Sequence, residues 1–324
     1  MTTNNNENKN TTITVLDTAQ AFRELLTAPV ADRPDLVRRM WEPMAGMFRF
    51  FPGGAQAVDI AEMDRHSVSF DWSGDTTASY VDRIHHAIDL MADVDAWGRT
   101  EHALRRGIEA IRAADQDATI PDLTVLLGIG DPDDAHFMDE IQGLTAFGGI
   151  SGYLQITVWP TPTVLGRIEA IAVHELHHSI RYSDGGVVWD PATVTLGEQV
   201  VAEGLADVFA AELYGEVGYT HFIDPVALED GDGTGPGRTE EIFATVTDAL
   251  DTTGMQNFTA WIHGDASARL FGVDPVGVPT GAGYAVGARI VRNYLAATGT
   301  TAAQNVRTPA DRIIAVAMRD DGGR

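Results

Sequence analysis

The chain has 324 residues, of which 22 are basic and 47 are acidic, so its formal net charge at neutral pH is −25. A charge of this size repels nucleic-acid phosphates and anionic membrane surfaces, and we expect neither as a partner. The absence of cysteine excludes disulfides, thiolate nucleophiles and cysteine-ligated zinc. The hydrophobic fraction of 44% is ordinary for a folded protein and excludes wholesale disorder.

The beginning of the chain is polar and rich in asparagine and threonine, so we expect a disordered tail over residues 1–12. It lacks the apolar core of a signal peptide. Nowhere does the sequence contain an apolar run of about 18 residues, the length a spanning helix needs. These features together predict a cytoplasmic protein that does not span a membrane.

Residues 13–118 are predicted to form a helical N-terminal region. Apolar side chains recur there at spacings of three and four, as in residues 19–26 and 80–91. A third such segment, residues 36–44, contains Pro43, which is expected to interrupt its helix.

The second half begins with strands. Residues 123–130 read as a buried strand that ends in glycines, and residues 149–159 alternate apolar and polar side chains. The alternation predicts one solvent-facing side and therefore a place near a sheet edge, where an extended peptide could add by main-chain hydrogen bonds. Thr195 and Glu198 predict a capping box at the start of a later helix. The expected helices cover residues 164–180, 195–213, 239–250 and 286–297.

One of these helices carries the motif His-Glu-x-x-His, formed by His174, Glu175 and His178. Side chains four apart lie on one helix face, with Cβ atoms about 6 Å apart, so both imidazoles can reach one zinc ion. Glu175 is turned away from that direction and is suited to accept a proton rather than bind the metal. His177 is an alternative ligand, but the usual spacing favours His178.

A catalytic zinc ion takes three protein ligands and keeps one open position, so a third ligand is needed. Glu203 and Asp207 lie one turn apart in an otherwise apolar helix. Burying two unpaired carboxylates would cost several kcal/mol, and a metal ion with its histidine ligands would remove that cost. We therefore predict Glu203 as the third ligand and Asp207 as the acceptor that orients a ligand histidine through its far ring nitrogen.

The two motifs, His-Glu-x-x-His followed by Glu-x-x-x-Asp, resemble those of the gluzincin metallopeptidases. They are more similar still to a family of predicted zinc-dependent proteases catalogued as a domain of unknown function. The resemblance covers about residues 120–300. It is carried by His-Glu-Leu-His-His at 174–178, Glu-Gly-Leu-Ala at 203–206 and Gly-Tyr-Ala-Val-Gly at 283–287.

The resemblance implies a zinc ion held by His174, His178 and Glu203, with Glu175 as the general base. It also implies that Tyr284 donates a hydrogen bond to the oxyanion of the transition state. An equally weighted interpretation of Tyr284 is a tyrosine that packs between helices.

His221 and His263 are alternative donors to the oxyanion, although a structural role is favoured for each.

A second metal signal lies in residues 230–241, Asp-Gly-Asp-Gly-Thr-Gly-Pro-Gly-Arg-Thr-Glu-Glu. Oxygen-bearing residues stand at positions 1, 3, 5 and 12 of a calcium loop, with glycine at position 6. Pro236 and Gly237 depart from the EF-hand pattern, so an acidic surface loop is favoured over a Ca²⁺ site.

The sequence thus predicts a mainly helical α+β protein, with a zincin-like metallopeptidase domain and a small sheet over residues 119–324. Its expected activity is hydrolysis of peptide or protein substrates by metal-activated water, with one zinc ion. The alternative is a zinc-containing binding or interaction protein without hydrolytic activity. The sequence does not indicate an oligomeric state.

Overall fold

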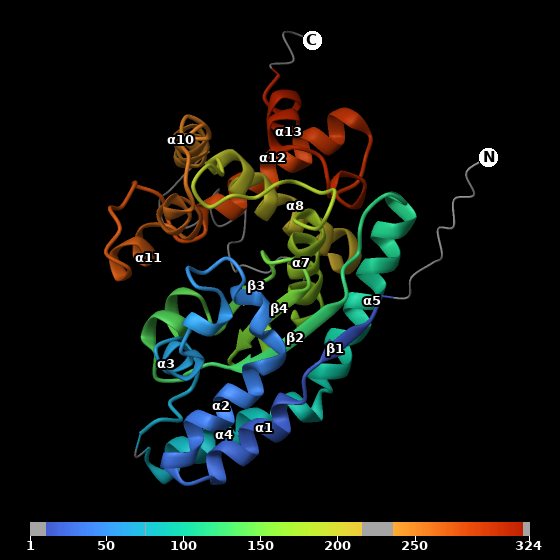
Figure 1. The fold of residues 1–324 in the computed structure, drawn as a ribbon. Coiled ribbons are helices and arrows are strands. Elements are labelled where there is room, and N and C mark those ends of the chain that lie inside the picture. Colours follow the sequence, from blue (N-terminus) through green and yellow to red (C-terminus); the bar gives the residue numbers. More distant parts are fainter. Residues whose placement is uncertain (1–10, 75, 216–235, 320–324) are drawn as a thin grey trace, which may run out of the picture.

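The computed structural model describes residues 11–74, 76–215 and 236–319, with no side-chain description for 236–238. Its centre is a sheet of four strands: β1 (Ile13–Val15), β2 (Leu123–Ile129), β3 (Leu144–Phe147) and β4 (Tyr153–Val158). Helices surround this sheet, and the protein is a mainly helical α+β fold, as its sequence predicts (Figure 1).

The strands are ordered β1-β2-β4-β3. β1 and β2 are parallel, as are β2 and β4, with Val125 opposite Leu154, whereas β3 runs antiparallel to β4 with Leu144 opposite Val158. The strand predicted at residues 149–159 lies near a sheet edge, as expected, but β4 is not the edge itself, because β3 pairs beyond it; the expectation that an extended peptide adds directly to this strand is therefore wrong. Its alternation arises because the side of the sheet that carries Tyr153 and Gln155 is only partly covered, while the short strand β3 pairs beyond it.

The N-terminal region is mostly helical, but it also provides β1, which pairs with β2 across more than a hundred residues of sequence. Pro43 follows the end of α2 and stands in the 3₁₀ turn η2, in agreement with the expected interruption. The helices here are α1 (Thr18–Thr27), α2 (Arg33–Trp41), α3 (Ile60–Arg65), α4 (Ala78–Asp93) and α5 (Ala96–Ala114), with 3₁₀ turns η1 (Val30–Asp32), η2 (Glu42–Phe48) and η3 (Ala55–Ala57).

The second half supplies the helices α6 (Pro162–Leu165), α7 (Ile168–Arg181), α8 (Leu196–Tyr214), α10 (Pro236–Thr247), α11 (Asp265–Leu270), α12 (Ala282–Thr298) and α13 (Ala310–Ala317). Its short turns are η4 (His136–Glu140), η6 (Met255–Asn257), η7 (Thr259–His263) and η8 (Ala303–Asn305). The single helix expected over residues 164–180 is divided at Gly166, the C-cap residue that follows α6. Glycine is a poor helix former, which explains the break.

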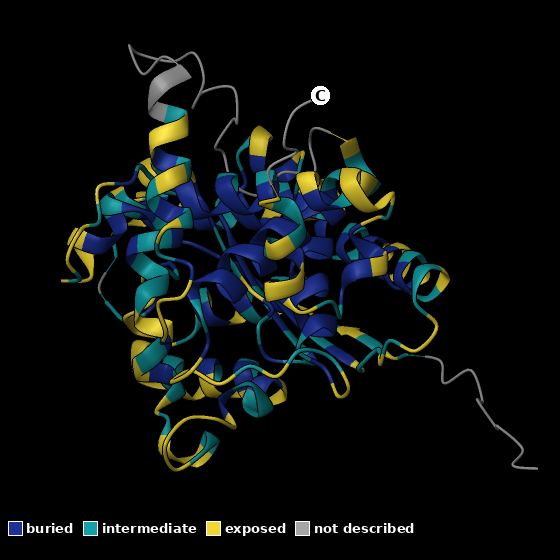
Figure 2. Ribbon diagram, turned by 90° about the horizontal axis from the view of Figure 1, so that it is seen from above, coloured by how far each residue is buried: buried dark blue, intermediate teal, exposed yellow. Residues whose placement is uncertain are grey.

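Helices cover both faces of the sheet. α1, α2 and η2 pack on the face that carries Leu126 and Thr157, and α5 and α7 pack on the other. α8 lies against α7, and α12 lies against α8, so these helices form successive layers away from the sheet (Figure 1). Figure 2 shows that the helices at the centre of the molecule are almost wholly buried, whereas exposed residues lie at the rim. α7 and α8 belong to the core, because nearly all residues of α7 and the first fifteen of α8 are buried.

The predicted capping box at the start of α8 is half present. The Thr195 hydroxyl accepts a hydrogen bond from the Glu198 backbone N–H, at 3.0 Å. The Glu198 carboxylate does not return to the backbone of Thr195, because it accepts from the guanidinium of Arg181 instead. A buried cation has displaced the second bond of the motif.

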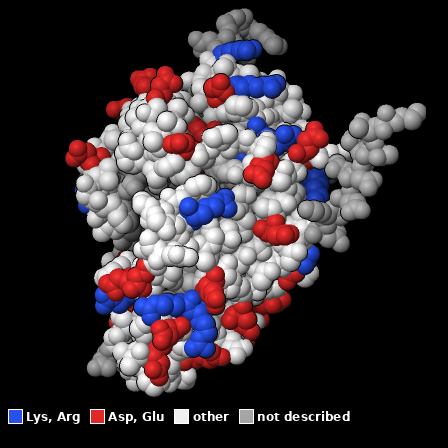
Figure 3. Space-filling view, viewed as in Figure 1, with Lys and Arg blue, Asp and Glu red and all other residues white. Residues whose placement is uncertain are grey.

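Acidic and basic side chains are scattered over the face shown in Figure 3, with broad uncharged areas between them. Some of the ion pairs on the surface are local, such as those between Arg38 and Asp35 and between Arg105 and Glu101, whereas others join distant segments, such as that between Arg83 and Asp133. Within the described part of the chain, every helix is too short or too polar to cross a membrane.

Candidate metal centre

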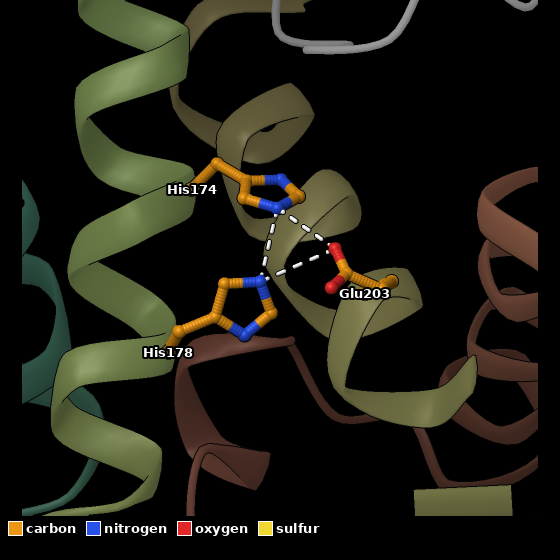
Figure 4. A group of neighbouring side chains, drawn as sticks. All are labelled: His174, His178 and Glu203. Atoms are coloured by element: carbon orange, nitrogen blue, oxygen red, sulfur yellow. Dashed lines mark hydrogen bonds and ion pairs between the residues drawn. The ribbon is translucent and has the colours of Figure 1, made fainter. Parts of the chain in front are cut away.

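Two facing helices of the core carry the candidate site. In α7, which bears the His-Glu-x-x-His motif, all residues but Glu169 are buried, and in α8 every residue from Leu196 to Ala210 is buried. Polar side chains occur inside this apolar pair of helices, where an isolated charge would be costly. His174 and His178 project from α7 toward Glu203 of α8 (Figure 4).

Three atoms of these side chains form a small triangle. Nε2 of His174 lies 3.0 Å from Nε2 of His178, and Oε2 of Glu203 lies 3.1 Å from the first and 3.2 Å from the second. All three residues are nearly buried, with exposures of 2%, 6% and 7%. Within the described residues, this is the single group of three or more potential metal-ligating side chains that converge closely enough to hold an ion.

The triangle fits a zinc ion. Tetrahedral zinc with ligands at about 2.0–2.1 Å separates its ligand atoms by about 3.3 Å, close to the three sides observed. The donors also fit chemically, because imidazole nitrogen and carboxylate oxygen are ordinary zinc ligands. If both rings are neutral, His174 donates through Nδ1 to Asp207 and presents a lone pair at Nε2. Two acceptors, on His174 and Glu203, then face each other, and a cation satisfies both.

Asp207 occupies the position predicted for it. Its Oδ1 accepts from Nδ1 of His174 at 2.9 Å, and the carboxylate is buried one turn beyond Glu203 on α8. This contact fixes the ring orientation of His174 and directs Nε2 toward Glu203.

The charges of the group are coupled. Burial opposes ionisation of Glu203, but the charge of His178 and the hydrogen bonds from His174 and His178 lower its pKa well below the usual range. Burial also opposes protonation of His174, yet the bond to Asp207 and the charges of Asp207 and Glu175 raise its pKa well above the usual value. In the metal-free site the carboxylate of Glu203 and the imidazole of His174 each favour the charged form of the other, and a metal ion would compete with a proton for the lone pair of Nε2.

Glu175 follows His174 on α7 and is also buried. Burial raises its pKa, although the charges of His174 and His178 act in the opposite direction. The chain just after β3 passes directly against it, because a Cβ added at Gly148 would lie 2.2 Å from the Glu175 carbonyl oxygen. The end of β3 is thus held next to the candidate base by a residue without a side chain.

Tyr284 of α12 lies near His174, with 6.4 Å between the two ring centroids. Burial raises its pKa well above the usual value, and the nearby charges of Glu203 and Glu175 act in the same direction. His263 of η7 stacks on Tyr284, with ring centroids 6.2 Å apart. Two of the candidate donors therefore lie together near the triangle, and the third, His221, lies outside the described residues.

His177, the alternative ligand, is not part of the triangle. Its ring is fully buried and lies 5.5 Å from the ring of Phe209. Burial lowers the pKa of His177 well below the usual value, so the ring is neutral.

Of the predicted calcium loop, residues 230–235 lie outside the described residues, and Pro236 already begins α10.

Glycines explain why the motifs of α8 and α12 belong together. A Cβ on Gly204 would lie 2.2 Å from the carbonyl of Gly287, and a Cβ on Gly287 would lie 2.1 Å from the carbonyl of Val200. The two helices can cross this closely because neither residue has a side chain. Glu203 precedes Gly204, and Tyr284 is three residues before Gly287, so the crossing brings both side chains near His174.

Comparison with known families agrees with the geometry. The sequence profile of a family described as "Predicted Zn-dependent protease (DUF2268)" matches residues 103–315. The chain belongs to this family. The match includes the whole triangle and the α12 motif, and it confirms the resemblance drawn from the three motifs. The family description suggests a zinc-dependent protease.

An uncharacterized protein of Bacillus subtilis (strain 168), YjfC, is 27% identical to this chain over 228 residues, which cover 70% of this chain and 72% of YjfC. No solved structure matches the chain.

Proposed function

We propose that this protein is a zinc-dependent peptidase with a zincin-like catalytic domain over residues 119–324. The observation that carries the proposal is the triangle of Nε2, Nε2 and Oε2 atoms with sides of 3.0–3.2 Å, buried between α7 and α8. Its dimensions and donors match a metal site with three protein ligands, and such sites leave a position open for chemistry.

The residues divide into clear roles. His174, His178 and Glu203 would hold the zinc ion, and Asp207 would keep His174 in the tautomer that presents Nε2. A bound zinc ion supplies a Lewis acid that polarises the scissile carbonyl and lowers the pKa of water to about 7.

Glu175 is the proposed general base. It would accept a proton from the attacking water and deliver it to the leaving amine. The raised pKa caused by burial suits this role, because the carboxyl then holds the proton between the two transfers.

Tyr284 is the proposed donor to the oxyanion, with His263 stacked on it as a second candidate. The raised pKa of Tyr284 keeps its hydroxyl protonated at neutral pH, as a hydrogen-bond donor must be.

The outer edge of β3 is the proposed guide for an extended peptide. Trp159 donates to the carbonyl of Gly143 at 2.7 Å, which fixes the alternation of the antiparallel pair. Thr145 and Phe147 then turn their backbone groups toward β4, whereas Ala146 turns its N–H and C=O outward. These outward groups can pair with a substrate strand, and Gly148, two residues further along the chain, lies against the backbone of Glu175.

The decisive experiment is Glu175→Gln, which keeps the size of the side chain and removes its basicity. We expect one zinc ion per protein, as in the wild type, and hydrolysis slower by about 10²–10⁴-fold. Elemental analysis and a peptide-library assay measure the two. His178→Ala is the control and should lose the zinc. Full activity in Glu175→Gln would reject the mechanism, and zinc binding without cleavage of any library peptide by the wild type would favour a binding protein instead.

A further inference from the structure

A buried ion pair joins the two helices that supply the triangle. Arg181 closes α7, and Glu198 lies in the first turn of α8. Nε and Nη2 of Arg181 each donate to one carboxylate oxygen of Glu198 at 2.7 Å, so the pair is bidentate. Arg181 is fully buried, and 8% of Glu198 is exposed.

The same guanidinium also holds a third segment of chain. Its Nη1 donates to the carbonyls of Val306 and Thr308, at 3.1 and 3.0 Å. Arg181 therefore ties the end of α7 to the start of α8 and to the connection before α13. All of its nitrogens are engaged, and this limits how far the three segments can shift relative to one another.

The pair stands close to the ligands in sequence and in space. Arg181 is three residues after His178, and Glu198 is five residues before Glu203. Tyr182 adds a second link, because its hydroxyl donates to Glu198 at 3.1 Å and its ring lies parallel to that of His178 with centroids 6.5 Å apart. Tyr182 thus connects Glu198 to the ring of His178, in addition to the bonds between Glu198 and Arg181.

Energetics argue that this pair does more than stabilise the fold. Desolvating two charges offsets most of their attraction, and buried pairs can often be replaced by apolar residues of similar volume without loss of stability. What a bidentate pair provides beyond apolar packing is a fixed distance and orientation. Side chains that must meet within a few tenths of an ångström across two helices require such fixing.

On the basis of the zinc site proposed above, we propose that Arg181 and Glu198 are positioning residues, which hold α7 and α8 in the one arrangement where the three ligands converge on a metal ion. They do not bind the ion themselves. Their effect is on metal affinity and geometry.

The chain contains a matched control at the other end of α7. Arg99 of α5 makes a bidentate pair with Glu169, with both N···O distances 2.6 Å, and donates to the carbonyl of Leu165 at 2.8 Å. This pair fixes α7 to α5 and makes no bond to α8. Replacing Arg99 and Glu169 removes a bidentate arginine–carboxylate pair from α7. The contacts between α7 and α8 stay as they are.

The experiment compares Arg181→Met/Glu198→Leu with Arg99→Met/Glu169→Leu. For each we measure the melting temperature of the metal-free protein, the zinc affinity by chelator competition, and the visible spectrum of the Co²⁺ form, which reports ligand geometry. We expect both double variants to fold, the first to bind zinc at least tenfold more weakly with an altered Co²⁺ spectrum, and the second to bind zinc within twofold of the wild type.

Zinc affinity within twofold of the wild type in Arg181→Met/Glu198→Leu, with an unchanged Co²⁺ spectrum, would overturn the proposal. An equal loss of affinity in both double variants would also overturn it, because the effect would then be general destabilisation. If the first variant does not fold, Tyr182→Phe decides: it removes one hydroxyl, and we expect zinc affinity to fall severalfold, whereas an unchanged affinity would count against the proposal. A wild type that binds no zinc would instead reject the proposed function itself.

Discussion

Two buried carboxylates, one in each half of the molecule, have opposite environments. Asp64 lies at the end of α3 in the N-terminal half and is 3% exposed, and Glu203 lies in α8 and is 7% exposed. Burial alone would raise the pKa of both. The pKa of Asp64 is indeed raised, whereas that of Glu203 is lowered, so the neighbours decide the outcome.

The neighbours of Asp64 are neutral hydrogen-bond donors. The indole N–H groups of Trp41 and Trp72 donate to its two oxygens at 2.9 and 2.7 Å, and the hydroxyl of Ser69 donates at 3.1 Å. The adjoining cavity has a volume of about 10 Å³, room for one water molecule. Every bond here runs from a donor to the carboxyl, so the group is satisfied without an ion.

The neighbours of Glu203 are two imidazoles that can each present a lone pair in the same direction. Burial by itself therefore does not mark a functional carboxylate. What distinguishes Glu203 is that acceptors converge on one point with too few protons between them, which is the arrangement that a cation completes.

The largest expected effect comes from Glu203→Gln, with Asp64→Asn as the matched control. Both changes replace a buried carboxylate by its amide. We expect zinc affinity to fall more than about 100-fold in Glu203→Gln, since losing a ligand should exceed the 10–100-fold cost of losing the partner of a ligand. Asp64→Asn should bind zinc as the wild type does. Competition with a chelator measures the zinc affinity of both variants. Equal losses of affinity in the two would contradict the difference between Glu203 and Asp64.

Asp207→Asn is expected to have a smaller effect. The amide can still accept from His174 Nδ1 but lacks the charge that favours this tautomer, so zinc affinity should fall by about 10–100-fold. Competition with a chelator measures the zinc affinity of this variant as well. Affinity equal to that of the wild type would mean that Asp207 does not orient the ligand.

The smallest effect concerns Asp64 and pH. Because burial raises its pKa above 3.8, the folded protein holds this proton more tightly than the unfolded chain does. Its contribution to stability is therefore complete below about pH 4 and declines as pH rises through the folded pKa. We expect the advantage of the wild type over Asp64→Asn in free energy of unfolding to shrink from pH 4 to pH 7, by about 1.4 kcal/mol per unit of pKa shift. Urea unfolding of the metal-free proteins measures it, and an advantage that grows with pH would contradict the assignment.

Local patterns in the sequence were enough to predict the centre of the site. The spacing of His174 and His178 follows from helix geometry, and two carboxylates in an apolar helix required a compensating partner. The same logic assigned Asp207 to a ligand histidine, and the structure pairs it with His174. These inferences depend on the spacing of residues within one helix or on the cost of burying a charge. The sequence of a single segment is enough to estimate either.

What the sequence could not supply depends on contacts between distant segments. β3 has four residues, too few for a periodic signal, and so the interior place of β4 was missed. The bond between Arg181 and Glu198 replaced half of an expected cap because tertiary packing outweighed a local preference. The close approach of Gly204 and Gly287 was visible as two glycines in two motifs, but nothing in the sequence showed that the helices cross there.

The pairing of Ile13 with Leu123 has a consequence for how the molecule can be divided. A fragment that started after α5 would keep α7 and α8, the helices of the triangle. Without β1, however, the backbone N–H and C=O groups along one side of β2 would be unpaired, and such an edge strand promotes self-association. It would also uncover the surface of α7 that α5 seals, including the Leu176 and Val173 side chains packed at Gly107. β1 therefore covers one edge of the sheet, and the half of the molecule that carries the triangle depends on a segment about a hundred residues earlier in the sequence.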